Sequence, residues 1–442
     1  MKDLTTGNPA KLMLQFAIPV CLGNVFQLFY SLADTRIVGS ALGEDSLAAV
    51  GATTAISTLL IGFLQGLTNG FSVVAAQNMG TGRMDQLRKT AAGTLLLGGV
   101  IAVFLTAVSL LSLPLLLRLM NVPEYLHGQA VGYICIVLLG LVITMLYNAC
   151  AGILRAVGDT VAPLIFLMCA SVLNIGLDLL FMVVLPLGVR GAALGTVLSQ
   201  LVSVVLSLLY VWKRYPVFHL NRADFQLERG KIKQMLSSGL SMGMMMSLVY
   251  FGTLSLQCAI NTLGTETIVA HTAARKITEL YFLPIIVMGL TVATFCGQNY
   301  GAGKFDRVRQ GIRNAVVITW GWTLLVILMS YTIAPQLIYL VSGSKNAAVL
   351  APAVLYLKIN APFFFVCCVI SIFRNTLQAM GDHIVPVISS AIELVGKVAI
   401  AMLLTPVLKY MGIIIAEPII WFFMVIPLIV RIAKNPQLKR KQ

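Results

Sequence analysis

The chain has 442 residues, of which 58% are hydrophobic and only 11% are Asp, Glu, Lys or Arg, and its formal net charge is +15. So few charged residues cannot cover the surface of a water-soluble fold of this length, and the composition therefore indicates an integral membrane protein.

Apolar stretches of about 20 residues, the length that an α-helix needs to cross a bilayer, recur along the whole chain. We predict twelve spans, at residues 11–37, 48–74, 91–117, 130–154, 161–185, 191–212, 235–262, 267–295, 312–341, 351–373, 385–408 and 411–433. The polar start of the chain and the length of the first span do not fit a cleaved signal peptide, so none is expected.

The basic residues are placed asymmetrically along these spans. With both termini in the cytoplasm, 22 of the 31 Lys and Arg residues fall in inner segments and four fall in outer loops. This bias follows the positive-inside rule, so we expect a multi-pass inner or plasma membrane protein with both termini cytoplasmic. The same placement directs the basic residues to lipid headgroups, which makes membrane lipids the expected partner and argues against nucleic acid.

Two motifs of the first half return in the second half. The segment Gln77–Arg88 is repeated at Gln298–Arg309, 221 positions later, with Gln, Asn, two Gly, Asp and the last Arg retained. The segment Leu154–Pro163 is repeated at Leu377–Pro386, 223 positions later. Two repeats at nearly one offset indicate a duplicated half, as in two-lobed transporters.

Each half holds six spans, so the second copy enters the membrane in the same direction as the first. We therefore predict an all-α integral membrane fold of twelve transmembrane helices in two parallel six-helix lobes, related by a pseudo-twofold axis along the membrane normal. The predicted parts are an N-lobe (1–212), a cytoplasmic linker (213–234), a C-lobe (235–433) and a basic cytoplasmic tail (434–442).

The glycine-rich repeat does not follow a strand, so we interpret it as a tight turn and not as a phosphate-binding loop. In such a turn Gly ends one helix, and Asp at the start of the next helix meets its positive dipole end. Pro19 lies inside the first span and removes one backbone hydrogen bond, which predicts a static bend or a hinge.

Acidic residues inside a bilayer are costly and require an explanation. Asp34 ends the first span, Asn174 and Asp178 share one face of the fifth because they are four residues apart, and Thr196 lies in the sixth. These oxygen ligands suit Na⁺ or shared protons, because two close carboxylates in an apolar site cannot both ionise cheaply. The alternative is that Asn174 and Asp178 only join helices through hydrogen bonds.

The second half has a different polar set. Glu279 follows Arg275 by four residues and Glu393 precedes Lys397 by four, so both are predicted to form ion pairs along a helix. Glu279, Glu393 and Lys397 are the polar candidates of the second lobe, while Glu417 has no evident partner in the sequence. His271 is expected to be a hydrogen-bonded packing residue and not a ligand.

Enzymatic chemistry has no support in the sequence. We find no nucleophile–base arrangement, no HExxH and no Walker motif, and the eight cysteines lie in apolar spans without a CxxC pair. The protein is therefore expected to be no enzyme and to need no cofactor beyond a coupling ion, H⁺ or Na⁺.

The chain resembles the multidrug and toxic compound extrusion (MATE) family over almost its whole length. The resemblance rests on the twelve spans, Pro19, the segment Ser31–Thr35 and the two repeated motifs. It implies antiport of small, drug-like, often cationic compounds against H⁺ or Na⁺ by alternating access. It also implies a cation site at the positions that match the family's first-lobe site, namely Asp34, Asn174, Asp178, Thr196 and Tyr133, and a helix that bends at Pro19.

The second half departs from one branch of that family. NorM-type members carry acidic residues in helices seven and ten, and the corresponding spans here contain none. The pattern is nearer to the DinF-like branch, and a monomer is expected. The alternative function is a lipid-linked saccharide flippase of the same superfamily, although such flippases usually have more spans and a strongly cationic cavity.

Overall fold

The computed structural model of the protein describes residues 2–120 and 122–439, and regular structure within these ranges is entirely helical. Within these described ranges, eleven helices are long and apolar enough to cross a membrane, and a bent pair of shorter helices brings the number to twelve. The all-α fold and the number of predicted spans are therefore confirmed.

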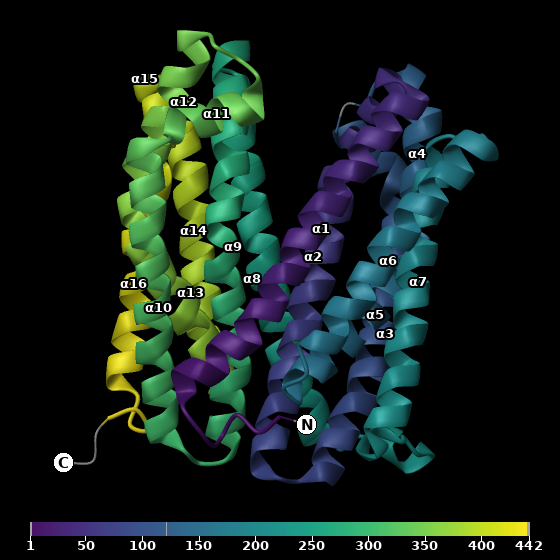
Figure 1. The fold of residues 1–442 in the computed structure, drawn as a ribbon, viewed down its shortest axis with the longest axis vertical. Helices are drawn as coiled ribbons and strands as arrows, with labels where there is room; N and C mark the ends of the chain where they lie inside the picture. The colour runs from purple at the N-terminus through teal and green to yellow at the C-terminus, as the bar shows by residue number, and fades with distance from the viewer. Residues whose placement is uncertain (1, 121, 440–442) are drawn as a thin grey trace. The chain divides into compact units, whose positions relative to one another are not determined.

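Within the described residues, the first six spans are formed by seven helices, which are coloured from purple to teal in Figure 1. These are α1 (Pro9–Leu42), α2 (Glu44–Thr81), α3 (Met84–Leu119), the bent pair α4 (Glu124–Leu139) and α5 (Leu141–Ala156), α6 (Val161–Leu179) and α7 (Val189–Arg214). A π-helical turn, Leu180–Val184, extends α6. Two 3₁₀ turns, Pro216–Phe218 and Arg222–Phe225, follow α7.

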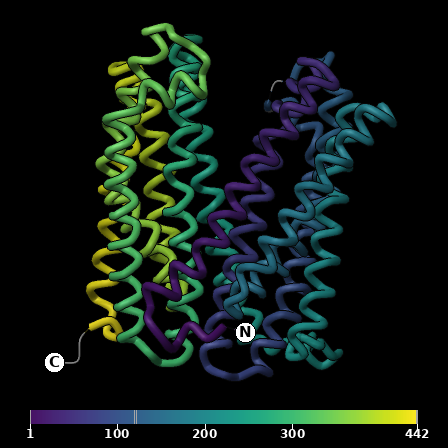
Figure 2. Tube along the Cα trace, in the orientation of Figure 1, coloured from purple at the N-terminus to yellow at the C-terminus, as the bar shows by residue number. Residues whose placement is uncertain are grey.

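The second half runs from teal to yellow in Figure 2. It contains α8 (Arg229–Asn261), α9 (Thr265–Gly301), α10 (Phe305–Thr332), α11 (Ala334–Ser342), α12 (Ala347–Asn360), α13 (Phe364–Ala379), α14 (Ile384–Leu403), α15 (Thr405–Leu408) and α16 (Tyr410–Lys434). The 3₁₀ turn Ala361–Phe363 joins α12 to α13 within one span.

Two predicted spans were too long. The stretch 312–341 is divided between α10 and α11, and 385–408 is divided between α14 and α15. Pro335 lies in the first turn of α11, and Pro406 lies in the first turn of α15. Because proline has no N–H group, it starts a helix more readily than it continues one.

The helices pack into two compact units. Of the described residues, the first unit holds those within 1–3 and 18–243, and the second holds those within 4–17 and 244–442. Helices α1 and α8 therefore each contribute to both units. The division within α1 falls between Ala17 and Ile18, next to Pro19, and the first unit extends beyond the predicted lobe boundary at residue 212.

Within the first unit, α2 and the first part of α8 cross through glycines. A Cβ atom on Gly66 would lie 2.5 Å from the Met242 carbonyl oxygen, and one on Gly70 would lie 2.4 Å from the Ser238 oxygen. The Ser238 hydroxyl donates a hydrogen bond to the Gly70 carbonyl at 2.9 Å. Small residues spaced four apart let two helix backbones approach in this way.

The repeated motifs form matching turns. Gly82 and Gly303 have φ angles of 71° and 70°, in the left-handed region that glycine adopts without strain. Asp85 and Asp306 lie in the first turns of α3 and α10. The prediction of a tight turn, with Gly ending one helix and Asp starting the next, is confirmed.

The loops at these turns also bind polar segments of the chain. In the first unit, Arg88 forms a 2.8 Å ion pair with Asp224 in the segment that follows α7. In the second unit, Arg307 and the Asn299 amide donate to the carbonyl oxygen of Leu4, whose side chain is buried. The duplicated loop therefore anchors two different segments.

Candidate functional site

The first-unit candidates lie on neighbouring helices. Asn174 and Asp178 are on α6, and Thr196 is on α7, which packs closely against α6. Asp178 is fully buried and Asn174 is 1% exposed. The π-helical turn begins two residues after Asp178, and such turns often mark functional positions in helices.

The Asn174 amide connects Asp178 to Thr196. When the amide is oriented to satisfy both neighbours, its nitrogen donates to Asp178 Oδ2 at 3.2 Å and its oxygen accepts from the Thr196 N–H at 3.2 Å. The Thr196 hydroxyl donates to the Ala192 carbonyl oxygen at 3.2 Å. The structure therefore brings together three of the residues that the sequence singled out.

Asp34, on α1, completes the group. The carboxyl groups of Asp34 and Asp178 lie within hydrogen-bonding reach of each other. The Oδ1 atom of Asp34 is buried, and it has no hydrogen-bond partner among the residues that the structure describes. Two carboxyl groups can share a hydrogen bond only if one of them holds a proton.

Tyrosines surround this carboxyl pair. Tyr133, on α4, lies near both carboxyl groups and packs against Val38 and Met182. Tyr30, one turn before Asp34 on α1, also lies near both, although the sequence reasoning missed it. Its spacing of four residues from Asp34 was the signal that could have indicated it.

Ion-paired residues of the second unit form two clusters, which include the candidates Glu393 and Lys397 but not Glu279. In the first, Glu393 accepts from Lys397 Nζ at 2.9 Å and from Arg374 Nη2 at 3.4 Å. Lys397 also donates to the Thr253 hydroxyl at 3.3 Å. The predicted Glu393–Lys397 ion pair is confirmed, and Arg374 is a partner that the sequence did not indicate.

The second cluster corrects a prediction. Arg275 pairs with Glu417 at 2.8 Å and not with Glu279, which instead lies 3.9 Å from Lys276 near the surface. The Tyr356 hydroxyl donates to the other Glu417 oxygen at 2.9 Å. Glu417 is 142 residues from Arg275 in the chain, and helix spacing alone cannot predict such a contact.

A cavity of about 220 Å³ lies beside both clusters, inside the second unit. It is lined from α8, α9, α12, α14 and α16 by Thr253, Leu256, Gln257, Ile260, His271, Thr272, Arg275, Lys276, Glu279, Tyr356, Lys397, Ile413 and Glu417. His271 contacts the Tyr410 hydroxyl at 3.3 Å, so its expected role as a hydrogen-bonded packing residue is confirmed.

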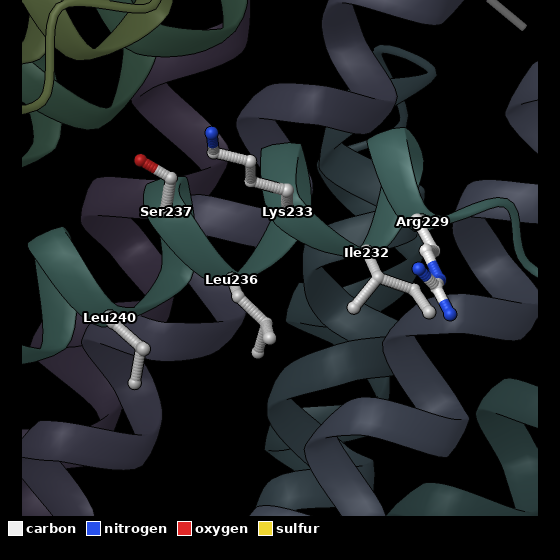
Figure 3. A pocket seen from close by; sticks show the side chains of 6 residues that line it. All are labelled: Arg229, Ile232, Lys233, Leu236, Ser237 and Leu240. Carbon is white, nitrogen blue, oxygen red and sulfur yellow. The ribbon is translucent and has the colours of Figure 1, made fainter.

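A second hollow, of about 470 Å³, lies along the start of α8 (Figure 3). Its lining combines the basic residues Arg229 and Lys233 with the apolar residues Ile232, Leu236 and Leu240. None of the predicted site residues lines it. Basic side chains beside an apolar helix face are typical of a helix end at a membrane surface.

Among the described residues, eleven helices long enough to span a membrane and one bent pair lie in two units with buried ionisable groups in each, which are the features of a secondary transporter. The chain belongs to the MatE family, whose sequence profile matches residues 19–180 and 241–403. The two matched segments lie in the two halves that the repeats define.

Known proteins agree with this assignment. The chain is 32% identical over 311 residues to "Probable multidrug resistance protein YpnP" of Bacillus subtilis, with 69% of this chain and 68% of that protein covered. It is 26% identical to a solved "outward-facing conformation of a multidrug resistance MATE family transporter", with a TM-score of 0.91 and with 99% and 98% of the two chains covered. A second structure, of "MATE in the bent conformation", has 26% identity, a TM-score of 0.89 and 97% coverage of both chains.

Proposed function

We propose that this protein exports small, apolar and often cationic toxic compounds in exchange for protons, and that Asp34 and Asp178 carry the coupling proton. The supporting observation is the carboxyl pair, in which the two groups lie within hydrogen-bonding reach of each other. The MatE family assignment supports export of such compounds.

A proton explains the first-unit geometry better than Na⁺ does. A sodium ion at Asp34, Asn174, Asp178 and Thr196 would be held between carboxylate oxygens, whereas a shared proton draws them together. The proposal therefore assigns Asp178 as the proton carrier and Asp34 as its partner.

The test is ethidium transport in proteoliposomes with H⁺ and Na⁺ gradients imposed separately. Native protein should transport ethidium under the proton gradient, and Asp34→Asn and Asp178→Asn should each abolish this transport. Asp45→Asn, the same change at an exposed carboxylate of the first unit, is the matched control and should transport normally. Transport driven only by Na⁺ would overturn the choice of ion.

The same proposal includes a hinge at Pro19. Its support is the division of α1 between the two compact units at Ala17 and Ile18, one residue before the proline. A proline inside a helix lacks one backbone hydrogen bond, so bending there is easier than elsewhere. Pro19→Ala should slow ethidium transport while ethidium still binds, and loss of binding instead would argue for a purely structural proline.

The proposal also covers the oligomeric state of the protein, its membrane and its orientation. The protein works as a monomer in the inner or plasma membrane with both termini in the cytoplasm, in line with the distribution of Lys and Arg. Membrane lipids contact its basic cytoplasmic residues. It is nearer to the DinF-like branch, because α8 has no acidic residue and neither do α12 and α13.

A further inference from the structure

We propose that the 220 Å³ cavity of the second unit is a binding site for the carboxylate or phosphate group of a small amphiphilic molecule, with Lys397 as the main contact. This site is separate from the carboxyl pair of the first unit. It extends the proposed range of ligands to molecules that bear a negative charge.

The charges beside the cavity do not balance. The two clusters contain three cations, Arg275, Arg374 and Lys397, but only two carboxylates, Glu393 and Glu417. The salt bridges of the described residues join these five groups only to one another. Lys276 and Glu279 also line the cavity, but they are 57% and 49% exposed and cancel each other.

The excess positive charge lies in the cluster that contains Lys397. Arg275 and Glu417 form a neutral pair, whereas Arg374 and Lys397 share the single carboxylate of Glu393. A buried charge without a counter-ion is costly, and an anionic ligand would relieve that cost.

Lys397 can reach such a ligand. Its side chain is only 5% exposed, yet it lines the cavity. The ammonium group has three protons, of which Glu393 and Thr253 accept two, so one donor remains for a ligand oxygen. A charge-assisted hydrogen bond in a buried site is among the stronger polar contacts.

The rest of the lining fits an amphiphilic molecule. Leu256, Ile260 and Ile413 form an apolar part of the wall, while His271 and Gln257 add polar groups. A Cβ atom on Gly252 would lie 2.9 Å from the Cδ atom of Lys397, so this glycine leaves room for the lysine side chain. A ligand with one anionic end and a small apolar body would match both parts of the wall.

The repeat supports the difference between the two units. At the offset of 223 positions, Lys397 occupies the place that Asn174 holds in the first half, and Ala401 occupies that of Asp178. On corresponding helices, the first unit therefore places a carboxyl group, Asp178 on α6, and the second unit places an ammonium group, Lys397 on α14. Opposite charges at related positions select ligands of opposite charge.

The experiment measures binding by calorimetry to the full-length protein in lipid nanodiscs, without any ion gradient. The probes are benzoate, benzyl phosphate, benzyl alcohol and benzylammonium, which share one apolar body. Benzoate or benzyl phosphate should bind at least about tenfold more tightly than benzyl alcohol. Preference for benzoate assigns the site to carboxylates, and preference for benzyl phosphate assigns it to phosphate esters.

Lys397→Met is the decisive variant. It removes the excess charge and leaves Arg374 paired with Glu393, so it should fold, and it should lose the preference for the anionic probes. Lys358→Met makes the same change outside the cavity of the same unit and should keep that preference. Equal binding of benzoate and benzyl alcohol by native protein, or an unchanged preference in folded Lys397→Met, would overturn the proposal without affecting proton coupling.

Discussion

Gly195 leaves the space that the Asp178 carboxyl group occupies: a Cβ atom at residue 195 would lie 2.3 Å from Asp178 Oδ1. Gly195 precedes Thr196 on α7, so the close approach of α6 and α7 depends on this glycine. The position of the carboxyl group is therefore set by a residue that carries no functional atom.

Gly195→Ala should displace the Asp178 side chain while leaving its chemistry intact. We expect proton-driven ethidium transport to fall by more than about tenfold, because displacement of a functional group by about 1 Å commonly costs that much. Gly176→Ala on α6 is the matched control, since a Cβ atom there meets nothing within 4 Å. If Gly195→Ala folds and transports at the native rate, the Asp178 position is not critical.

Gly66→Ala tests the crossing of α2 and α8. The added methyl group would meet backbone atoms of Met242 and Gly243, so the helices must move apart. Overpacking of this kind costs about 1–3 kcal/mol, which should lower the thermal unfolding temperature in detergent.

Gly51→Ala is the control on the same helix, because a Cβ atom there meets nothing within 4 Å. It should stabilise the protein by about 0.5–1 kcal/mol, since alanine loses less conformational freedom in a helix than glycine. Equal unfolding temperatures for the two variants would show that the crossing tolerates a methyl group.

The fold could be predicted largely from the sequence because hydrophobic length and repeated motifs are local signals. The breaks within spans were harder to predict. α4 and α5 bend by 42° around Gly140, where a Cβ atom would lie 2.5 Å from Val197 Cγ2. This contact, the tightest that such a Cβ atom would make, joins residues far apart in the chain, so hydrophobic length and repeated motifs did not indicate the bend.

The two candidate sites also differ in whether helix spacing in the sequence could predict their contacts. Asn174 and Asp178 could be found because they lie one helical turn apart on one helix. Glu417 and Arg275 could not, because the nearer Glu279 also satisfied the helix spacing, and only the fold brings α9 and α16 together. Tertiary contacts therefore determine that Arg275 pairs with Glu417 and not with Glu279.

The Arg88–Asp224 ion pair should make the stability of the folded protein depend on pH in the acid range. Partial burial alone would raise the pKa of Asp224, but hydrogen bonds from the Asn221 N–H and from Arg88, with the charge of Lys89, lower this pKa below its usual value. A lowered pKa adds stability that is present above the unfolded-state value and is lost as pH falls through the folded-state value.

Native protein should therefore unfold at a higher temperature than Asp224→Asn at pH 7, and the difference should shrink steadily as the pH is lowered below about 4. Thermal unfolding of both proteins across this range is the measurement. A constant difference at every pH would mean that the aspartate acts through the shape of its turn and not through its charge.

Residues 4–7 are held in the second unit by hydrogen bonds from the repeated motif. The Leu4 N–H donates to Gln298 Oε1 at 2.9 Å, and the Asn299 amide donates to the Leu4 carbonyl oxygen at 3.2 Å. Asn299 Oδ1 also accepts from Arg307 at 2.9 Å, and Arg307 in turn donates to the Gly7 carbonyl oxygen. Asn299 therefore supports two of the contacts that hold residues 4–7.

Asn299→Ala should increase amide hydrogen exchange in residues 4–7 by about tenfold at pH 7, because it leaves a buried carbonyl group and a guanidinium without one partner each. Asn78→Ala is the matched control, since Asn78 holds the same place in the first copy of the motif and donates instead to the Thr90 hydroxyl. Exchange in residues 4–7 should be unchanged in that variant. If both variants raise it equally, the motif acts through general stability and not by docking this segment.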